Sequence, residues 1–226
     1  MKVRGLPEPQ GLYTPENEHD NCGVGFLANI KNRKSHNIIR QGLQILVNLD
    51  HRGAVGADPL AGDGAGILLQ VPDRLFREDC AAKGIDLPPP GEFGVGMLFL
   101  PQIQDTADLC VAAIEKITLA EGQICLGWRD VPVDNSFLGE SVGPDEPRIR
   151  QFFVGRGPDT PDQDAFERKL FVIRKQCHRE VWNSGVDKAD AFYMTSMSCR
   201  TIVYKGMMLS GNLSNYYLDL QDPRME

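Results

Sequence analysis

The chain has 226 residues, which is long enough for one large domain or two small ones with a sizeable core. Its 42% hydrophobic and 24% charged residues are ordinary for a soluble globular protein. The 24 Lys and Arg residues against 31 Asp and Glu residues give a formal net charge of −7, and no long basic run occurs. This balance disfavours nucleic acid and anionic membranes as partners.

Targeting signals and cysteine usage narrow the class further. No apolar stretch approaches the ~18 residues of a membrane span, and the N-terminal residues lack the apolar centre of a secretory signal. We therefore expect a cytoplasmic protein. The six cysteines (22, 80, 110, 125, 177 and 199) form no Cys-x-x-Cys pair, so we expect no zinc or iron-sulfur site within this segment. Most should be buried, reduced thiols.

The first third of the chain changes character at Cys22. Residues 1–21 are polar, with three prolines and two glycines, and are not typical of a core element. From Cys22 to Ile30 the sequence is compact and apolar enough for a buried strand. The segment from Asn37 to Leu49 places apolar side chains near helical spacing, which predicts a helix. A glycine-rich loop from His51 to Gly66 then leads into a predicted strand at 67–72.

The rest of the chain alternates predicted strands and helices. In order these are a short helix near 73–83 with Asp73 as candidate cap, a strand from Phe93 to Leu100, a helix from Thr106 to Glu121, strands at 123–131 and 149–155, a helix at 162–183 and a strand-like run from Ala191 to Tyr204. The helix at 162–183 has Asp162 as candidate cap and one apolar stripe, formed by Phe166, Leu170, Ile173, Cys177 and Val181. The interleaved elements indicate a mixed α and β class.

Three features point to chemistry: Cys22 at the start of the first predicted strand, the loop His51-Arg52-Gly53, and the glycine-rich run at 61–67. Each alone is a weak signal, since cysteines are usually buried, Arg-Gly pairs are usually solvated turns and glycines usually serve backbone geometry. The glycine-rich run does not predict a dinucleotide site. That fingerprint needs a strand before the glycines and a helix after them, whereas here a loop precedes and a β-rich run follows.

Taken in order and spacing, the three features resemble the class II glutamine amidotransferases. In that family a Cys-Gly-(Ile/Val)-x-Gly strand begins the mature chain, and a helix leads to His-Arg-Gly. The segments 54–67 and 196–208 are similar to the glutamate synthase branch of the family. The resemblance runs from about Gly11 to the last residue. It divides the chain into a leader at 1–21 and the N-terminal part of an amidotransferase domain at 22–226.

The resemblance implies a fold and a reaction. The fold is α+β, a four-layer α-β-β-α sandwich of the N-terminal-nucleophile hydrolase type that is incomplete at the C-terminus. Alternation of strands and helices alone could not select it. The reaction is hydrolysis of L-glutamine through a cysteinyl thioester to glutamate and ammonia, followed by transfer of the ammonia to 2-oxoglutarate elsewhere in the full enzyme.

Residue types at the matched positions suit this reaction. A thiol such as Cys22 is a strong nucleophile, and covalent catalysis divides a difficult amide displacement into two steps. If cleavage frees the α-amino group of Cys22, that amine, with a pKa of about 7.7–8.0, can exchange protons with the thiol and the leaving ammonia. No catalytic histidine is then needed, so His19, His36, His51 and His178 can be structural or exposed.

Three further residues are candidates for binding substrate or organising the active site: Arg52, Gly53 and Asp63. The planar donor fork of Arg52 suits carboxylate or carbonyl oxygens, although a structural loop cation is the alternative. Asp63 could orient the same loop, or it could be a turn residue among glycines. Arg200 also lies in a matched segment, where a packing or surface role is the safer interpretation.

The resemblance also implies what this segment lacks. We expect no cofactor here, while FMN and an iron-sulfur cluster belong to the rest of the full enzyme, together with a small reductase subunit as partner. No histidine is followed two places on by arginine and no asparagine directly precedes glycine. In the family such motifs hold the substrate carboxylate and supply oxyanion donors, so a truncated chain should hydrolyse glutamine inefficiently.

Two alternatives stay open. The segment could be a non-catalytic fragment that packs against the rest of a synthase. It could also be another class II amidotransferase that feeds a phosphoribosyl, sugar or asparagine-forming site. The leader before Cys22 and the long insertion from Asp58 to Gly66 weigh against the second alternative.

Overall fold

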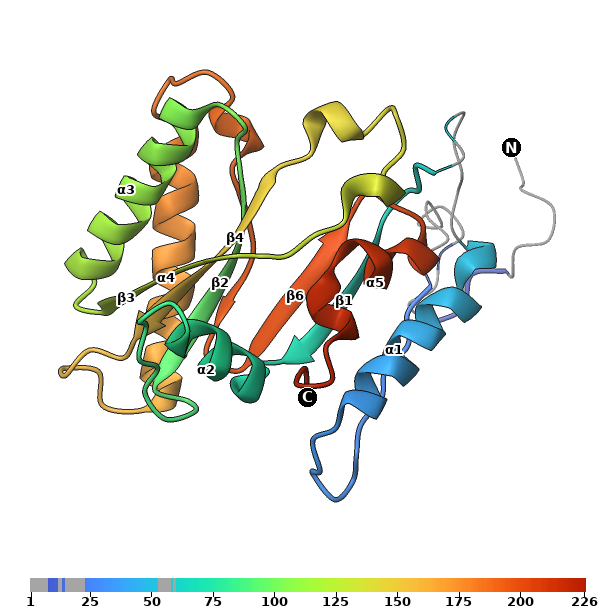
Figure 1. Ribbon diagram of the computed structural model, residues 1–226, viewed down its shortest axis with the longest axis horizontal. Helices are drawn as coiled ribbons and strands as arrows, with labels where there is room; N and C mark the ends of the chain where they lie inside the picture. The colour runs from blue at the N-terminus through green and yellow to red at the C-terminus, as the bar shows by residue number, and fades with distance from the viewer. Residues whose placement is uncertain (1–7, 12–13, 15–22, 53–57, 59) are drawn as a thin grey trace.

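A computed structural model describes residues 8–11, 14, 23–52, 58 and 60–226. Within them the chain forms two antiparallel sheets with helices around them, so the expected mixed α and β class is confirmed (Figure 1). The elements are α1 (His36–Asn48), η2 (Asp50–Arg52), β1 (Ala65–Gln70), α2 (Asp73–Ala81), β2 (Phe93–Leu100), α3 (Gln104–Ala120), β3 (Ile124–Asp130), η3 (Asn135–Phe137), η4 (Gly143–Asp145), β4 (Arg148–Gly155), α4 (Gln163–Trp182), η5 (Ala189–Ala191), β5 (Tyr193–Ser198), β6 (Thr201–Gly206), η6 (Ser210–Asn212), α5 (Leu213–Tyr216) and η7 (Leu218–Gln221).

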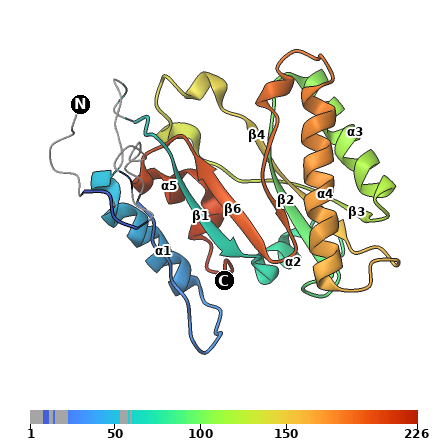
Figure 2. The ribbon, with the colours of Figure 1, turned by 180° about the vertical axis from the view of Figure 1, so that it is seen from behind.

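The larger sheet has the strand order β3-β4-β2-β5, and α3 and α4 cover one of its faces (Figures 1 and 2). Side chains of β2, β4 and β5 pack there against the apolar faces of both helices. Gly94 on β2 is needed for this packing, because a Cβ at that position would lie 2.5 Å from the Leu170 Cδ1 atom of α4. The absence of a side chain therefore lets α4 approach the sheet closely.

The opposite face of the larger sheet carries a second core. Phe93, Val95 and Met97 alternate along β2 and point to this side, as period-2 strand geometry requires. The core joins α2 to the smaller sheet, which pairs β1 with β6, and Phe76 of α2 meets Phe153 of β4 edge to face at 5.3 Å. The larger sheet thus lies between α3 and α4 on one side and β1-β6 on the other.

Most elements lie where periodicity placed them. The predicted helix at 37–49 is α1, and the predicted strand from Phe93 to Leu100 has the observed bounds. Asp162 caps α4 as expected, since its side chain accepts a hydrogen bond from the Ala165 backbone N–H at 2.7 Å. The apolar stripe predicted on this helix is completely buried.

The predicted strand that begins at Cys22 is wrong for the described residues 23–30. They form no strand, because they lie beside α1 rather than beside a sheet edge. Gly23 and Gly25 face the helix: Cβ atoms there would lie 3.2 Å from Leu49 and 2.5 Å from Ile45. Their neighbours Val24 and Phe26 are 89% and 91% exposed.

Two further predictions need correction. Asp73 is the first residue of α2 rather than its cap, because its carboxylate pairs with Arg77 one turn later at 2.7 Å. The strand-like run from Ala191 to Tyr204 is two strands in different sheets. The chain turns between them where Ser198 Oγ accepts hydrogen bonds from the backbone N–H groups of Arg200 and Thr201 at 3.0 and 3.1 Å.

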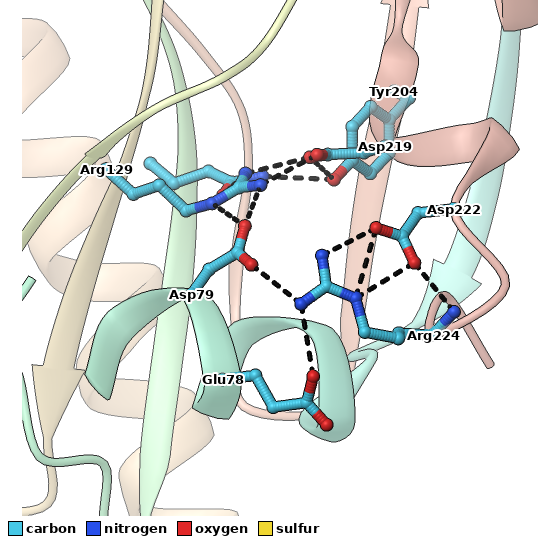
Figure 3. Close-up of polar contacts among 8 residues, drawn as sticks. Glu78, Asp79, Arg129, Tyr204, Asp219, Asp222 and Arg224 are labelled. Atoms are coloured by element: carbon cyan, nitrogen blue, oxygen red, sulfur yellow. Dashed lines mark hydrogen bonds and ion pairs between the residues drawn. The ribbon is translucent and has the colours of Figure 1, made fainter. Parts of the chain in front are cut away.

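A buried polar network joins the two sheets (Figure 3). Arg129 of β3, only 3% exposed, donates to both oxygens of Asp219 at 2.9 and 2.7 Å, to Asp79 at 3.0 and 2.6 Å, and to Gln151 at 2.9 Å. The Tyr204 hydroxyl on β6 donates to Asp219 at 2.8 Å and accepts from Gln151 at 3.0 Å. Strands β3, β4 and β6 are therefore tied to α2 and η7 by one set of bonds.

A second arginine extends this network toward the surface. Arg224 pairs with Asp222 at 2.6 Å, with Glu78 at 3.1 Å and with Asp79 at 3.0 Å, so Asp79 connects the two arginines (Figure 3). Burial acts to lower the pKa of Arg129, but hydrogen bonds and charge from Asp219 and Asp79 outweigh it and raise that pKa. The guanidinium therefore stays charged while buried.

We expect Arg129→Leu to destabilise the protein by about 3–5 kcal/mol, because it leaves the Asp219 carboxylate buried without its cation. Urea unfolding monitored by circular dichroism measures this change. Lys116→Met removes the exposed ion pair with Glu180 and should cost no more than about 1 kcal/mol. Equal losses for the two variants would contradict the role assigned to Arg129.

His178 is a structural residue of the helical layer. Its Nε2 atom accepts a hydrogen bond from the Met194 backbone N–H at 3.0 Å, and its ring stacks on Trp182 and Tyr193 at 5.0 and 5.7 Å. Burial, followed by the charges of Arg174 and Lys175, lowers the pKa of His178 from 6.5 to about 4. The folded state therefore holds this ring neutral.

This lowered pKa predicts a loss of stability in acid. Below about pH 6.5 His178 is protonated in the unfolded chain, whereas in the folded protein it stays neutral until about pH 4. The free energy of unfolding therefore decreases between these pH values by up to roughly 3 kcal/mol. His178→Gln keeps an acceptor for the Met194 N–H but does not titrate. The difference in unfolding free energy between wild type and variant should shift against the wild type from pH 7 to pH 4. Equal changes in the unfolding free energies of wild type and His178→Gln between pH 7 and pH 4 would contradict the lowered pKa of His178.

Candidate active site

The described residues that follow Cys22 lie against the end of α1. Gly23 contacts Leu49, and η2 follows directly after Leu49, from Asp50 to Arg52. Cys22 and Gly53 themselves lie outside the described residues. The structure therefore places the residue after the predicted nucleophile beside the turn that leads into the His-Arg-Gly loop. The structure describes the backbone of Arg52, whereas the Arg52 side chain is outside the described part of the chain.

Residues 206–210, at the end of β6 and just after it, contact both η2 and the glycine-rich loop. Ser210 Oγ donates to the Asp50 carboxylate in η2 at 2.7 Å. A Cβ on Gly62 would lie 2.6 Å from the carbonyl oxygen of Met208, so the glycine-rich run is packed directly on this segment. Residues 206–210 thus touch both η2 and the loop that carries Asp63. Among the described residues, η2 and the glycine-rich loop therefore meet at the end of the smaller sheet where β1 begins and β6 ends.

Asp63 lies at this end of the sheet and is exposed. Its carboxylate forms no hydrogen bond or ion pair within the described part of the chain. The neighbouring Gly64 has φ +122, a conformation that favours glycine, and the first strand residue, Ala65, pairs with Gly206. The structure therefore brings the loop that carries Asp63 to the same segment as η2.

The five cysteines of the described chain are poor nucleophiles. Burial raises the pKa of Cys80, Cys110 and Cys125 to about 11, and that of Cys177 and Cys199 to about 12. A thiol with such a pKa carries almost no thiolate near neutral pH. The expectation of buried, reduced thiols therefore holds for these residues, with Cys125 half-buried.

The described histidines have structural partners. His51 Nδ1 lies 3.0 Å from the Asn48 carbonyl oxygen at the end of α1, and His36 Nδ1 lies 3.0 Å from the carbonyl oxygen of Met225. His178 is engaged in the helical layer, and His19 lies outside the described residues. These contacts are compatible with chemistry that uses no separate histidine base.

Two contacts that sequence reasoning missed fix the surroundings of these motifs. Asp58 accepts hydrogen bonds from the backbone N–H and the hydroxyl of Ser141 at 2.9 and 2.6 Å, which lowers the pKa of its carboxyl group. Asp50 accepts from Ser210, as described above. Both pairs join residues more than eighty positions apart, so no local pattern could have revealed them.

The described residues contain neither a candidate metal cluster nor a membrane-spanning helix. No group of three or more His, Cys, Asp or Glu side chains that could hold a metal ion occurs within the described ranges. Among the helices of the described chain, none combines the length and the apolar character that crossing a membrane requires.

Comparison with known proteins shows the family to which the chain belongs. The chain matches the family described as glutamine amidotransferases class-II over residues 22–226, and it is a member of that family. The match begins at Cys22.

The more particular likeness is to glutamate synthases. The chain is 45% identical over 98% of its length to the glutamate synthase (NADPH) large chain of Bacillus subtilis. It is 38% identical over 95% to that of Azospirillum brasilense, and 37% identical over 91% to the ferredoxin-dependent glutamate synthase 2 of Synechocystis. The chain spans 14%, 14% and 13% of the lengths of these relatives.

The contact between Gly62 and Met208 can be tested directly. We expect Gly62→Ala to lower stability by about 1–3 kcal/mol, because the added methyl group would meet backbone atoms that have little freedom to move. Gly211→Ala is the matched control in the same region, since a Cβ there has nothing within 4 Å. Urea unfolding compares the two variants, and an equal effect of both would show that the loop does not pack as described.

Proposed function

We propose that the chain is the glutamine-hydrolysing region of a glutamate synthase, with Cys22 as its nucleophile. The contacts of Gly23 with Leu49, of Asp50 with Ser210 and of Gly62 with Met208 carry this proposal. Membership of the class II amidotransferases supports the reaction class. The raised pKa values of the other five cysteines support Cys22 because they disfavour each of those five as the nucleophile.

In this mechanism residues 1–21 are removed and Cys22 becomes the first residue. Its thiol attacks the carboxamide carbon of L-glutamine, the C–N bond breaks with release of ammonia, and water hydrolyses the thioester to glutamate. The free α-amino group takes the thiol proton and delivers it to the leaving nitrogen. A family match that begins at residue 22 is the observation that favours this starting point.

Arg52, Gly53 and Asp63 organise the surroundings of the nucleophile in this proposal. Gly23 lies against Leu49, three residues before Arg52 in the sequence, and this contact supports a place for Arg52 near the nucleophile. The guanidinium of Arg52 can hold an oxygen of the substrate or of the peptide unit next to Cys22. The Asp63 carboxylate is exposed and uncommitted within the described chain, so it is available to orient the same loop.

The two sheets and the helices around them would be part of a four-layer sandwich in the complete domain. The ammonia would serve reductive amination of 2-oxoglutarate in ammonia assimilation, at FMN and iron-sulfur regions outside this chain, and a small reductase subunit would supply electrons in the cytoplasm. For the chain by itself we propose slow hydrolysis, because it has neither a His-x-Arg nor an Asn-Gly motif. Loss of one oxyanion donor typically costs about 10²–10³ in rate.

Substitution of Cys22 tests the proposal in a complete synthase that contains this chain. Cys22→Ala should abolish glutamine-dependent glutamate formation and leave ammonia-dependent formation intact, because ammonia bypasses the thioester. Both activities are measured as oxidation of the electron donor with 2-oxoglutarate present.

Cys125→Ala is the matched control and should retain both activities, since burial raises the pKa of that thiol to about 11. Intact-mass analysis of the active wild type should show Cys22 as its first residue. Glutamine-dependent activity in Cys22→Ala, or full activity with residues 1–21 in place, would refute the mechanism.

A further inference from the structure

A groove of about 610 Å³ opens between the end of β2, the loop at 138–147 and the end of β6. Its volume lies within the range of sites for small molecules, about 300–1,000 Å³. Its lining does not include Asp63, but it includes Gly206, Met207 and Met208, so the groove adjoins the candidate active site described above.

The floor of the groove is apolar. Phe99, Leu100, Ile149, Met208 and Tyr217 contribute to it, and four of these five side chains are rigidly placed in the cores on the two faces of the larger sheet. Leu138 and Val142 line it from the loop. A ligand with an aromatic or branched apolar body would therefore be buried against a preformed surface.

Two lysines line the same groove without a carboxylate partner. Lys205 Nζ lies 3.2 Å from the Tyr193 hydroxyl and 4.5 Å from the centre of its ring, and it forms no ion pair with a described residue. Lys188, held at φ 59, is exposed and likewise forms no ion pair within the described chain. Contacts with Tyr193 restrict the Lys205 side chain, which lowers the entropy cost of binding an anion.

Acidic residues on the loop define how much negative charge the ligand can carry. Asp145 and Glu146 also line the groove, and Glu146 accepts a hydrogen bond from the Tyr216 hydroxyl at 2.7 Å, which holds it in place. A second carboxylate on the ligand would meet these like charges. The charge pattern thus favours one negative charge rather than two.

We propose that this groove binds a small organic acid with a single carboxylate and an aromatic or branched apolar body. The carboxylate pairs with Lys205, assisted by Lys188, and the apolar body lies on the floor formed by Phe99, Met208 and Tyr217. The like charges of Asp145 and Glu146 make the dicarboxylates glutamate and 2-oxoglutarate poorer ligands.

Phenylacetate is the probe for this site, measured by ligand-observed NMR or calorimetry with the 226-residue chain. For a ligand of this size we expect a dissociation constant on the order of 1 mM. Phenylacetamide, which has the same shape without the charge, and phenylsuccinate, which has a second carboxylate, should each bind about tenfold more weakly.

Lys205→Met should weaken phenylacetate binding about tenfold, and Lys205→Arg should restore most of it. The matched control is Lys175→Met, which removes another lysine that lies over an aromatic ring, Phe171, but does not line the groove. If Lys205→Met fails to fold, Lys188→Met takes its place with a smaller expected loss.

Equal affinity for phenylacetate and phenylacetamide would overturn the proposal, as would equal effects of the Lys205 and Lys175 substitutions. Absence of saturable binding would overturn it as well and would leave an apolar polypeptide segment as the better occupant. None of these results would affect the assignment of Cys22, which does not depend on the groove.

Discussion

The structure depends on the buried pairing of Arg129 with Asp219. An arginine that is 3% exposed and a carboxylate that is 2% exposed are unfavourable unless each satisfies the other. Their bonds, extended by Tyr204, connect β3 of the larger sheet to β6 of the smaller one and to η7. Apolar packing could join these elements in several registers, whereas this hydrogen-bond geometry defines the register shown.

The position of the candidate active site depends on the pairing of Arg129 with Asp219, because the site lies at the end of β6. Within the described residues β1 pairs with β6, and Ile67 lies opposite Tyr204, the residue that Asp219 holds. The loop with Asp63 precedes β1, and the segment at 206–210 follows β6 and reaches η2 through Ser210. A change at Arg129 would therefore reach the site through β6, although no atom of Arg129 lies there.

Sequence reasoning succeeded where the signal is local. The apolar stripe of α4 and the apolar run of β2 are buried in the cores, so the spacing of their apolar residues predicts the helix and the strand correctly. It failed at Val24 and Phe26, whose apolar character suggested a buried strand although they are exposed. The partners Asp50 with Ser210 and Arg129 with Asp219 are distant in sequence, so their pairing could not be predicted. Order and spacing of motifs identified the family but could not position their side chains.

The structure agrees with the sequence context that the glycine-rich run is not a phosphate-binding loop, and it shows what the glycines do instead. Phosphate binding would require these glycines to open a helix, but they lead into β1. Two of them instead allow close approach of the chain: a Cβ would lie 2.6 Å from Met208 at Gly62 and 2.8 Å from Lys205 at Gly66. Gly64 between them has φ +122. The run is glycine-rich because β6 and the segment after it occupy the space that side chains would need.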